Sequence, residues 1–289
     1  MIDGLVVVDK AAGWTSHDVV AKCRGIFGQK RVGHAGTLDP GATGVLLVGL
    51  GRVTRLLRYP GALPKTYVGE VVLGTETSTL DNEGEVTATH DMSGVTLDDV
   101  RTAAERFVGD IEQVPPMVSA VKVGGRRLHE LARAGEEVER EARQVTVYSL
   151  SVSDTADAGV FTLEVTCSAG TYVRTLAADL GHALGGGAHL RNLRRTAIGR
   201  FPVADARPIE ALGPDAVLQP AEAMRGYAAV TVAPALADSI RHGKVLETSA
   251  LGAEGEGPWA VVDAEGGLLA VYEAYDEARV KPAVVIASA

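Results

Sequence analysis

The chain has 289 residues, with 28 Lys and Arg against 37 Asp and Glu, so its formal net charge is −9 and its pI is near 5.3. A composition of 46% hydrophobic and 22% charged residues is typical of a globular protein and excludes a disordered chain. The acidic total argues against a uniformly basic nucleic-acid binder. It leaves room for a basic face, because a sum over the chain hides where the charges lie.

Charge is distributed unevenly along the sequence. Residues 1–60 carry a local charge of +4 and residues 171–210 a local +3, whereas residues 61–170 carry −10. The two basic segments, if folded together, would form one positive surface for a phosphate backbone. The alternative is that both are ordinary solvated faces of a protein with charges of both signs.

Cysteine usage and hydropathy indicate the compartment. The two cysteines, Cys23 and Cys167, are too few for a disulfide framework or a zinc cluster, and their apolar surroundings predict buried thiols in a reducing compartment. The first residues lack the basic start and long apolar run of a signal peptide. No window approaches the roughly 18 apolar residues of a membrane span. We therefore expect a cytoplasmic protein that binds no membrane.

In the first third of the chain, apolar and alternating runs predict strands over residues 4–9, 44–49 and 65–74. Ser16 is a candidate N-cap for a helix over residues 17–27. Residues 28–44 hold five glycines and a proline and are expected to form a loop.

The middle of the chain mixes both kinds of element. Helices are predicted over residues 97–108, capped by Thr96, and over residues 171–184, where three glycines follow. The densely charged residues 124–143 suggest an exposed projection. Strands are predicted over residues 118–123, 143–153, 160–168 and 189–199.

The character changes near residue 228, after a segment rich in proline and glycine. Residues 228–289 are acidic and predict a small β-rich domain with one helix near 235–242. Its strands are expected over residues 259–263, 268–275 and 279–286. Strands and helices that do not alternate regularly favour an α+β fold over a doubly wound sheet. We expect two domains, at residues 1–227 and 228–289.

The glycine-rich segment from Gly33 to Gly44 carries one carboxylate, Asp39, directly before Pro40. A phosphate-binding loop would require GxGxxG or GxxxxGK[ST], and neither pattern is present. Two interpretations remain open from these residues alone. The aspartate is either the start of a structural turn, or a nucleophile or base held by a rigid Gly/Pro frame.

Five further motifs surround this segment. In order and spacing, the whole set resembles the bacterial tRNA pseudouridine-55 synthase (TruB) family over about residues 1–200. The motifs are GLVVVDKAAGWTS at 4–16, GHAGTLDP at 33–40, KTY at 65–67, PPMVSAVK at 115–122, CSAGTYVRTLAADLG at 167–181 and HLRNLRRT at 189–196. Residues 228–289 resemble the small PUA-type RNA-binding domain of that family more weakly. One departure is Ala11, where the family usually has proline.

The resemblance implies a mixed, mainly antiparallel central sheet flanked by helices, the pseudouridine synthase fold, plus a PUA-like C-terminal domain. It implies isomerisation of uridine 55 in the tRNA T stem-loop by a monomer that uses no cofactor and no metal. Asp39 matches the catalytic aspartate, which either attacks the sugar or deprotonates it to a glycal. A non-catalytic tRNA-binding or tRNA-folding module is the alternative. A glycosidase would require a second acid, which no motif supplies.

The resemblance also assigns roles to other residues in and around the site. Tyr67 matches the tyrosine that stacks on the target base, and Arg174 matches the arginine that pairs with the catalytic aspartate. Tyr172 lines the pocket. His34 contacts the T loop during extrusion of the base, which costs a few kcal/mol.

The remaining expected contacts with RNA are mostly basic residues. A thumb-like insertion at about residues 117–143 contributes phosphate contacts that close on the RNA. The expected RNA-binding residues are Lys10, Lys122, Arg126, Arg127, Arg133, Leu193 and Arg195, and Arg191 and Arg194 continue the positive surface.

Overall fold

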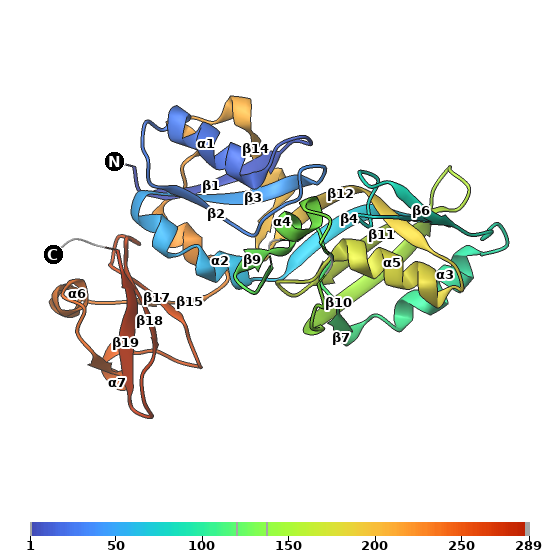
Figure 1. Cartoon of the computed structure of the whole chain (residues 1–289). Helices are drawn as coiled ribbons and strands as arrows, with labels where there is room; N and C mark the ends of the chain where they lie inside the picture. The colour runs from blue at the N-terminus through green and yellow to red at the C-terminus, as the bar shows by residue number, and fades with distance from the viewer. Residues whose placement is uncertain (1, 120, 137, 287–289) are drawn as a thin grey trace. The chain divides into compact units, whose positions relative to one another are not determined.

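The computed structural model describes residues 2–119, 121–136 and 138–286 (Figure 1). The described chain forms two compact units. Unit 1 consists of three segments: the residues up to Pro40, then Gly44–Ala62, and then the residues from Gly199 onward. Unit 2 takes Gly41–Thr43 and Leu63–Ile198.

The first sheet of unit 1 is built on β1 (Gly4–Lys10). It runs antiparallel to β3 (Thr43–Leu50) and parallel to β14 (Arg207–Pro208). A strand that we did not predict, β2 (Val32–Ala35), pairs with β3 inside the segment expected to be a loop. Because β2 has only four residues and lies in a glycine-rich segment, its sequence shows no clear alternation of apolar and polar side chains. Its strand conformation depends on pairing with β3.

Helix α1 (Ser16–Ile26) covers this sheet with Val19, Val20 and Cys23 in the core. Burial raises the pKa of the Cys23 thiol to about 11. The helix lies where it was predicted, but its N-cap is Thr15, whose side chain and that of Asp18 form a capping box. The prediction that Ser16 is the cap was therefore wrong.

A five-stranded sheet occupies the C-terminal part of unit 1, in the order β15-β17-β18-β19-β16. The strands are β15 (Ala228–Thr231), β16 (Leu246–Glu247), β17 (Trp259–Val262), β18 (Leu268–Ala274) and β19 (Arg279–Val285). With α6 (Pro234–Arg241) and α7 (Thr248–Leu251) they enclose an apolar core. The three predicted strands and the predicted helix are confirmed, whereas β15 and β16 were missed.

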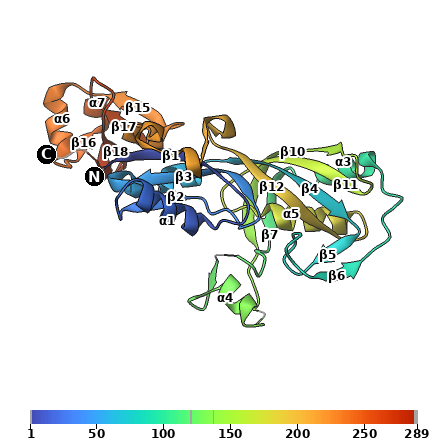
Figure 2. The same ribbon diagram turned by 90° about the horizontal axis from the view of Figure 1, so that it is seen from above.

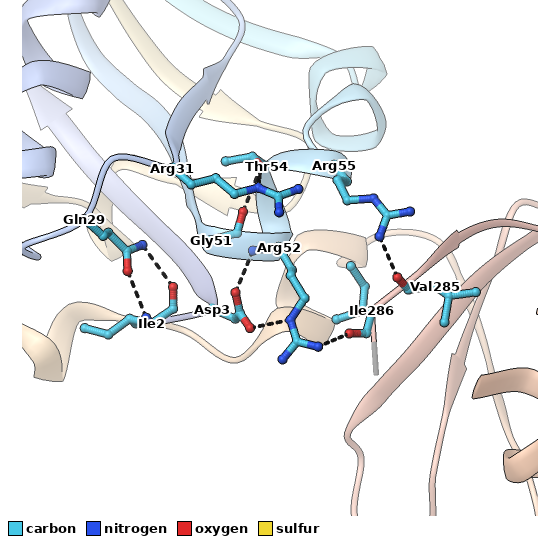
Figure 3. A network of polar contacts seen from close by, with 10 residues as sticks. All are labelled: Ile2, Asp3, Gln29, Arg31, Gly51, Arg52, Thr54, Arg55, Val285 and Ile286. Carbon is cyan, nitrogen blue, oxygen red and sulfur yellow. Dashed lines mark hydrogen bonds and ion pairs between the residues drawn. The ribbon is translucent and has the colours of Figure 1, made fainter. Parts of the chain in front are cut away.

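Two arginines connect the end of β19 to a 3-10 helix, η1 (Gly51–Arg55), within unit 1 (Figure 3). Arg52 Nη1 donates to the carbonyl of Ile286 at 2.7 Å, and Arg55 Nη1 donates to that of Val285 at 2.8 Å. Asp3 accepts both the backbone N–H of Arg52, at 2.6 Å, and its Nε, at 2.7 Å. These bonds join the first strand region to the last.

Unit 2 contains an antiparallel sheet in the order β12-β4-β11-β10-β7. The strands are β4 (Lys65–Leu73), β7 (Gly109–Gln113), β10 (Arg143–Asp154), β11 (Val160–Cys167) and β12 (Ala188–Ile198). Helix α5 (Val173–Ala183) packs against β12, and α3 (Leu97–Glu105) packs against β10 and α5 (Figure 2). Thr96 caps α3 as predicted.

Two hairpins complete unit 2. One joins β5 (Thr75–Thr77) to β6 (Val86–Thr89), and the other joins β8 (Lys122–Val123) to β9 (Arg126–Arg127). The second hairpin continues into α4 (Leu128–Arg133) and stands away from the sheet of unit 2 (Figure 2), as the charged projection was expected to do. The strand predicted over residues 118–123 is reduced to β8.

Short helices fill the connections of unit 1. They are α2 (Arg58–Ala62), η2 (Val203–Asp205), η3 (Ile209–Ala211), η4 (Pro214–Ala216) and η5 (Pro220–Met224), with a two-residue strand, β13 (Phe201–Pro202). The predicted α+β fold is confirmed, with mixed, mainly antiparallel sheets flanked by helices. The domain boundary at residues 227 and 228 stays a prediction. Within the described residues, no helix is both long and apolar enough to cross a membrane.

Candidate active site

The segment that carries Asp39 joins β2 to β3 and is held on both sides of the aspartate. Before it, Leu38 donates its N–H to Ser16 Oγ at 2.9 Å, and the same hydroxyl donates back to the Leu38 carbonyl at 3.2 Å. After it, the carbonyl of Pro40 accepts the N–H of Gly13 at 3.0 Å. Leu38 is buried, whereas Asp39 is partly exposed. The backbone of the segment is therefore fixed on both sides of a partly exposed aspartate.

Lys10 at the end of β1 provides the second support for Pro40. Its side chain is fully buried, and Nζ donates to the carbonyls of Ala11 at 3.0 Å, Trp14 at 2.7 Å and Pro40 at 3.0 Å. Lys10 therefore supports the Asp39 segment from a buried position. Its predicted contact with RNA stays a prediction.

His34 lies on β2, and its ring meets that of His17 edge-to-face with 5.4 Å between ring centroids. His17 belongs to the first turn of α1, so the contact joins the helix to the strand that precedes Asp39. The predicted contact of His34 with the T loop stays a prediction.

Arg174 lies in the first turn of α5, where its side chain is almost completely buried. Its Nη1 donates to the Thr79 carbonyl at 2.7 Å and lies 3.3 Å from Asp81 Oδ2. Its Nη2 donates to the Val118 carbonyl at 2.9 Å. Three groups from two loops of unit 2 thus fix the guanidinium. The predicted pair of Arg174 with Asp39 stays a prediction.

Tyr172 occupies the N-cap position of α5 and is held through its backbone. The buried amide of Gln113 accepts the Tyr172 N–H at 2.9 Å and donates to its carbonyl at 3.3 Å. These two hydrogen bonds connect the start of α5 to the end of β7. Sequence reasoning missed Gln113, because its contacts are to backbone and leave no pattern in the sequence.

Tyr67 and Lys65 lie on the same buried face of β4, where side chains alternate. The guanidinium of Arg195 lies 6.0 Å from the centroid of the Tyr67 ring, a cation–π distance. Burial, with a smaller effect of the Arg195 charge, lowers the pKa of Lys65 to about 8. Arg195 is only 1% exposed. It packs beside Tyr67, and its predicted contact with RNA stays a prediction.

The predicted thumb residues are only partly described. Arg126 Nη1 lies 3.0 Å from Glu136 Oε2, and both side chains are half exposed. Three thumb side chains lie outside the described residues, and their predicted phosphate contacts stay predictions: Lys122, Arg127 and Arg133. Leu193 lies half-buried in an irregular part of β12.

The profile described as "TruB family pseudouridylate synthase (N terminal domain)" matches residues 24–173. The profile "tRNA pseudouridylate synthase B C-terminal domain" matches residues 174–224. The chain belongs to the TruB family of pseudouridylate synthases. The two matched segments of this TruB-family protein include Asp39, Tyr67 and Arg174.

Curated relatives agree with this membership. The tRNA pseudouridine synthase B of Rhodococcus jostii (strain RHA1) is 45% identical over 277 residues, which cover 93% of this chain and 90% of the relative. The protein of the same name from Symbiobacterium thermophilum is 50% identical over 246 residues, which cover 84% of this chain and 82% of the relative.

A solved structure extends the likeness to the fold. One chain of the crystal structure of a Cbf5-Nop10-Gar1 complex matches with a TM-score of 0.75 and 26% identity, covering 99% of this TruB-family chain and 84% of that chain. A chain of an archaeal box H/ACA Nop10-Cbf5 complex has the same fold, with a TM-score of 0.74 at 24% identity.

Proposed function

We propose that this TruB-family enzyme isomerises uridine 55 in the T loop of tRNA to pseudouridine, with Asp39 as the nucleophile. The general activity, isomerisation of a uridine in tRNA, follows from the family and from relatives named tRNA pseudouridine synthase B that match most of the chain. The choice of uridine 55 and the roles of individual residues are supported by the motif resemblance and by the geometry around each residue.

The reaction is an internal exchange of one bond. The N1–C1′ bond breaks and its electron pair stays with the uracil, while the Asp39 carboxylate attacks C1′ or removes a proton from C2′. The uracil turns, C5 forms a bond to C1′, and the carboxylate leaves or takes part in the reverse proton transfer. C5 then loses its proton and N1 gains one, so atoms and electrons balance without a cofactor.

The observation that carries the proposal is the support on both sides of Asp39. The residue before it, Leu38, is fixed by Ser16, and the residue after it, Pro40, is fixed by Lys10 and Gly13. A carboxylate that must reach one sugar carbon gains rate from such positioning, because a misplacement of about 1 Å can reduce the rate by about a hundredfold.

Buried cations support the roles proposed for Tyr67 and Arg174. Tyr67 offers its ring to the extruded uracil, and the cations of Arg195 and Lys65 behind it favour the negative charge that the uracil gains when N1–C1′ breaks. Arg174 is the proposed partner that orients Asp39, and its own position is fixed by Asp81 and two carbonyls.

We further propose that the enzyme acts as a cytoplasmic monomer on the T stem-loop and needs no metal. Exposed basic side chains of the projection, represented by Arg126, are the proposed phosphate contacts. Recognition would depend on the shape of the loop and on extruded bases, as is usual for single-stranded RNA elements. Full activity in excess EDTA is the expected result for a metal-independent enzyme.

The test uses a T stem-loop RNA with tritium at uridine C5. Loss of the C5 proton releases tritium to water, so wild type should release it and Asp39→Asn should not. Release by both proteins at the same rate would remove Asp39 from the chemistry. No release by wild type, with RNA still bound, would favour the alternative of a non-catalytic tRNA-binding or tRNA-folding module.

A further inference from the structure

Strand β12 departs from regular pairing with β4 at two places, between Arg191 and Arg194 and between Arg195 and Ala197. The first of these adds one residue to β12. Arg191 lies opposite Glu70, but the next described pair is Arg194 opposite Val68, followed by Arg195 opposite Tyr67. Three steps along β12 therefore match two steps along β4, which is the signature of a β-bulge.

The bulge decides which arginine shares a face with Tyr67. Residues directly opposite each other on paired strands point to the same side of the sheet, and a shift of one residue moves a side chain to the other side. With regular pairing from Arg191 onward, Arg194 would stand opposite Tyr67, and Arg195 would stand opposite Thr66. The extra residue instead brings Arg195 to the buried face of Tyr67, where it makes the cation–π contact.

One carboxylate holds the bulge in place. Glu70 Oε2 accepts from Arg191 Nε at 2.5 Å and from Asn192 Nδ2 at 3.0 Å. Asn192 has φ of 55°, a left-handed conformation that asparagine and glycine adopt more readily than other residues. Gly69 leaves the room that the bulge needs, since a Cβ there would lie 3.4 Å from Leu193 and 3.2 Å from Leu190.

The bulge also sets the position of Arg194. Its Nη1 lies 3.4 Å from Thr43 Oγ1, a contact within unit 2. Thr43 follows Asp39 by four residues in the sequence. One backbone irregularity thus directs Arg195 to Tyr67 and the preceding residue, Arg194, to Thr43.

We propose that Glu70 and Asn192 are positioning residues: they fix the β12 bulge that sets Arg195 against Tyr67 and Arg194 against Thr43. The proposal rests on the proposed roles of Asp39 and Tyr67. Neither residue touches the reacting atoms, so both act on the rate through the arginines that follow them. Because Glu70 is partly exposed, its removal should lower the rate more than the stability.

The test compares single-turnover tritium release from C5-labelled T stem-loop RNA with the RNA dissociation constant and the melting temperature. Glu70→Ala should lower the rate constant about tenfold or more with little change in RNA affinity, since small misplacements act on the chemical step. Glu70→Gln keeps an acceptor oxygen for Arg191 and should recover most of the rate. Asp157→Ala is the matched control for Glu70→Ala, because it removes only the exposed second partner of Arg191, 2.6 Å from Nη2.

A second pair of variants tests the backbone conformation itself. Asn192→Gly tolerates the positive φ and should keep most of the rate, whereas Asn192→Val, with a branched side chain that disfavours it, should lose about tenfold or more. Equal rates in Glu70→Ala, Asn192→Val and wild type would overturn the proposal. A wild type that releases no tritium would instead refute the proposed function, so the two failures are distinguishable.

Discussion

Arg174 and Asp81 form an ion pair inside unit 2, with 3.3 Å between Nη1 and Oδ2 and only 5% and 16% of the two side chains exposed. The same Nη1 donates to the carbonyl of Thr79, two residues before Asp81. One short loop between β5 and β6 therefore supplies both a charge and a carbonyl to the arginine that we propose orients Asp39.

Replacing Asp81 should reduce catalysis more than RNA binding. Asp81→Asn keeps the size of the side chain but removes the Asp81 charge from the buried Arg174 guanidinium, which should cost roughly 1–3 kcal/mol of stability. The single-turnover rate of tritium release should fall at least about tenfold, because the orientation of the guanidinium is relaxed. The matched control is Glu85→Gln, an exposed acid of the same loop. An unchanged rate in Asp81→Asn would show that Arg174 does not need the Asp81 carboxylate to act.

Lys10 should prove to be a support of the Asp39 segment and not an RNA contact. Lys10→Met removes the donor shared by the carbonyls of Ala11, Trp14 and Pro40, so the free energy of unfolding should fall by roughly 1–3 kcal/mol. The rate of tritium release should fall while the RNA dissociation constant and its salt dependence stay near those of wild type. The exposed Lys22→Met on α1 is the control. A smaller dependence of RNA affinity on salt concentration in Lys10→Met than in wild type would show that Lys10 does contact the RNA.

Arg126 tests the projection as a phosphate contact. Arg126→Ala should weaken binding to T stem-loop RNA and reduce the slope of log affinity against log salt by up to about one, since one phosphate contact is lost. Glu136→Gln removes the acid that lies 3.0 Å from Arg126 and should strengthen binding at low salt. Binding assays across a salt series measure both effects. If neither variant changes the slope, this part of the projection does not contact the RNA backbone.

Lys65 should make stability depend on pH in the alkaline range. Its pKa is lowered from 10.5 to about 8, mainly because burial disfavours the charge, so the charged form opposes folding. That cost is fully present below the folded pKa and is relieved as the pH rises from about 8 to about 10.5. Lys65→Met should therefore be more stable than wild type near pH 7. The difference should shrink toward pH 10, because folded wild type then loses the proton of Lys65 and with it the cost of the buried charge.

Urea unfolding of both proteins at several pH values measures this difference. The comparison isolates Lys65, because the other titrating groups are common to both proteins. A difference between Lys65→Met and wild type that stays constant from about pH 7 to about pH 10 would contradict the lowered pKa.

The sequence predicted the elements whose pattern is local. The alternation of β4, the stripe of α1 and the capping threonine of α3 all appear in the structure where the pattern indicated. It failed for β2 and β15, strands of four residues whose existence depends on a partner elsewhere in the chain. Short strands are stabilised by pairing with a partner strand, and their own few residues do not indicate that partner.

The site residues also fall into those that a sequence motif identifies and those that only the folded structure reveals. The residues that carry the proposed chemistry, Asp39, Tyr67 and Arg174, were named because they stand in long motifs. Asp81 was missed because nothing in the sequence separates it from the acids at Glu83 and Glu85. The burial of Lys10 and Arg195 was not foreseen, because a sequence shows a positive charge without showing whether it is buried.

The two partners of the Arg52 side chain, Asp3 and Ile286, are synthesised at very different times. Its partner Asp3 is synthesised before it, so that ion pair can close early, whereas Ile286 follows it by 234 residues. During translation the Arg52 guanidinium therefore has the Asp3 carboxylate long before the Ile286 carbonyl exists. A chain interrupted before β19 lacks the bonds that join its first and last segments.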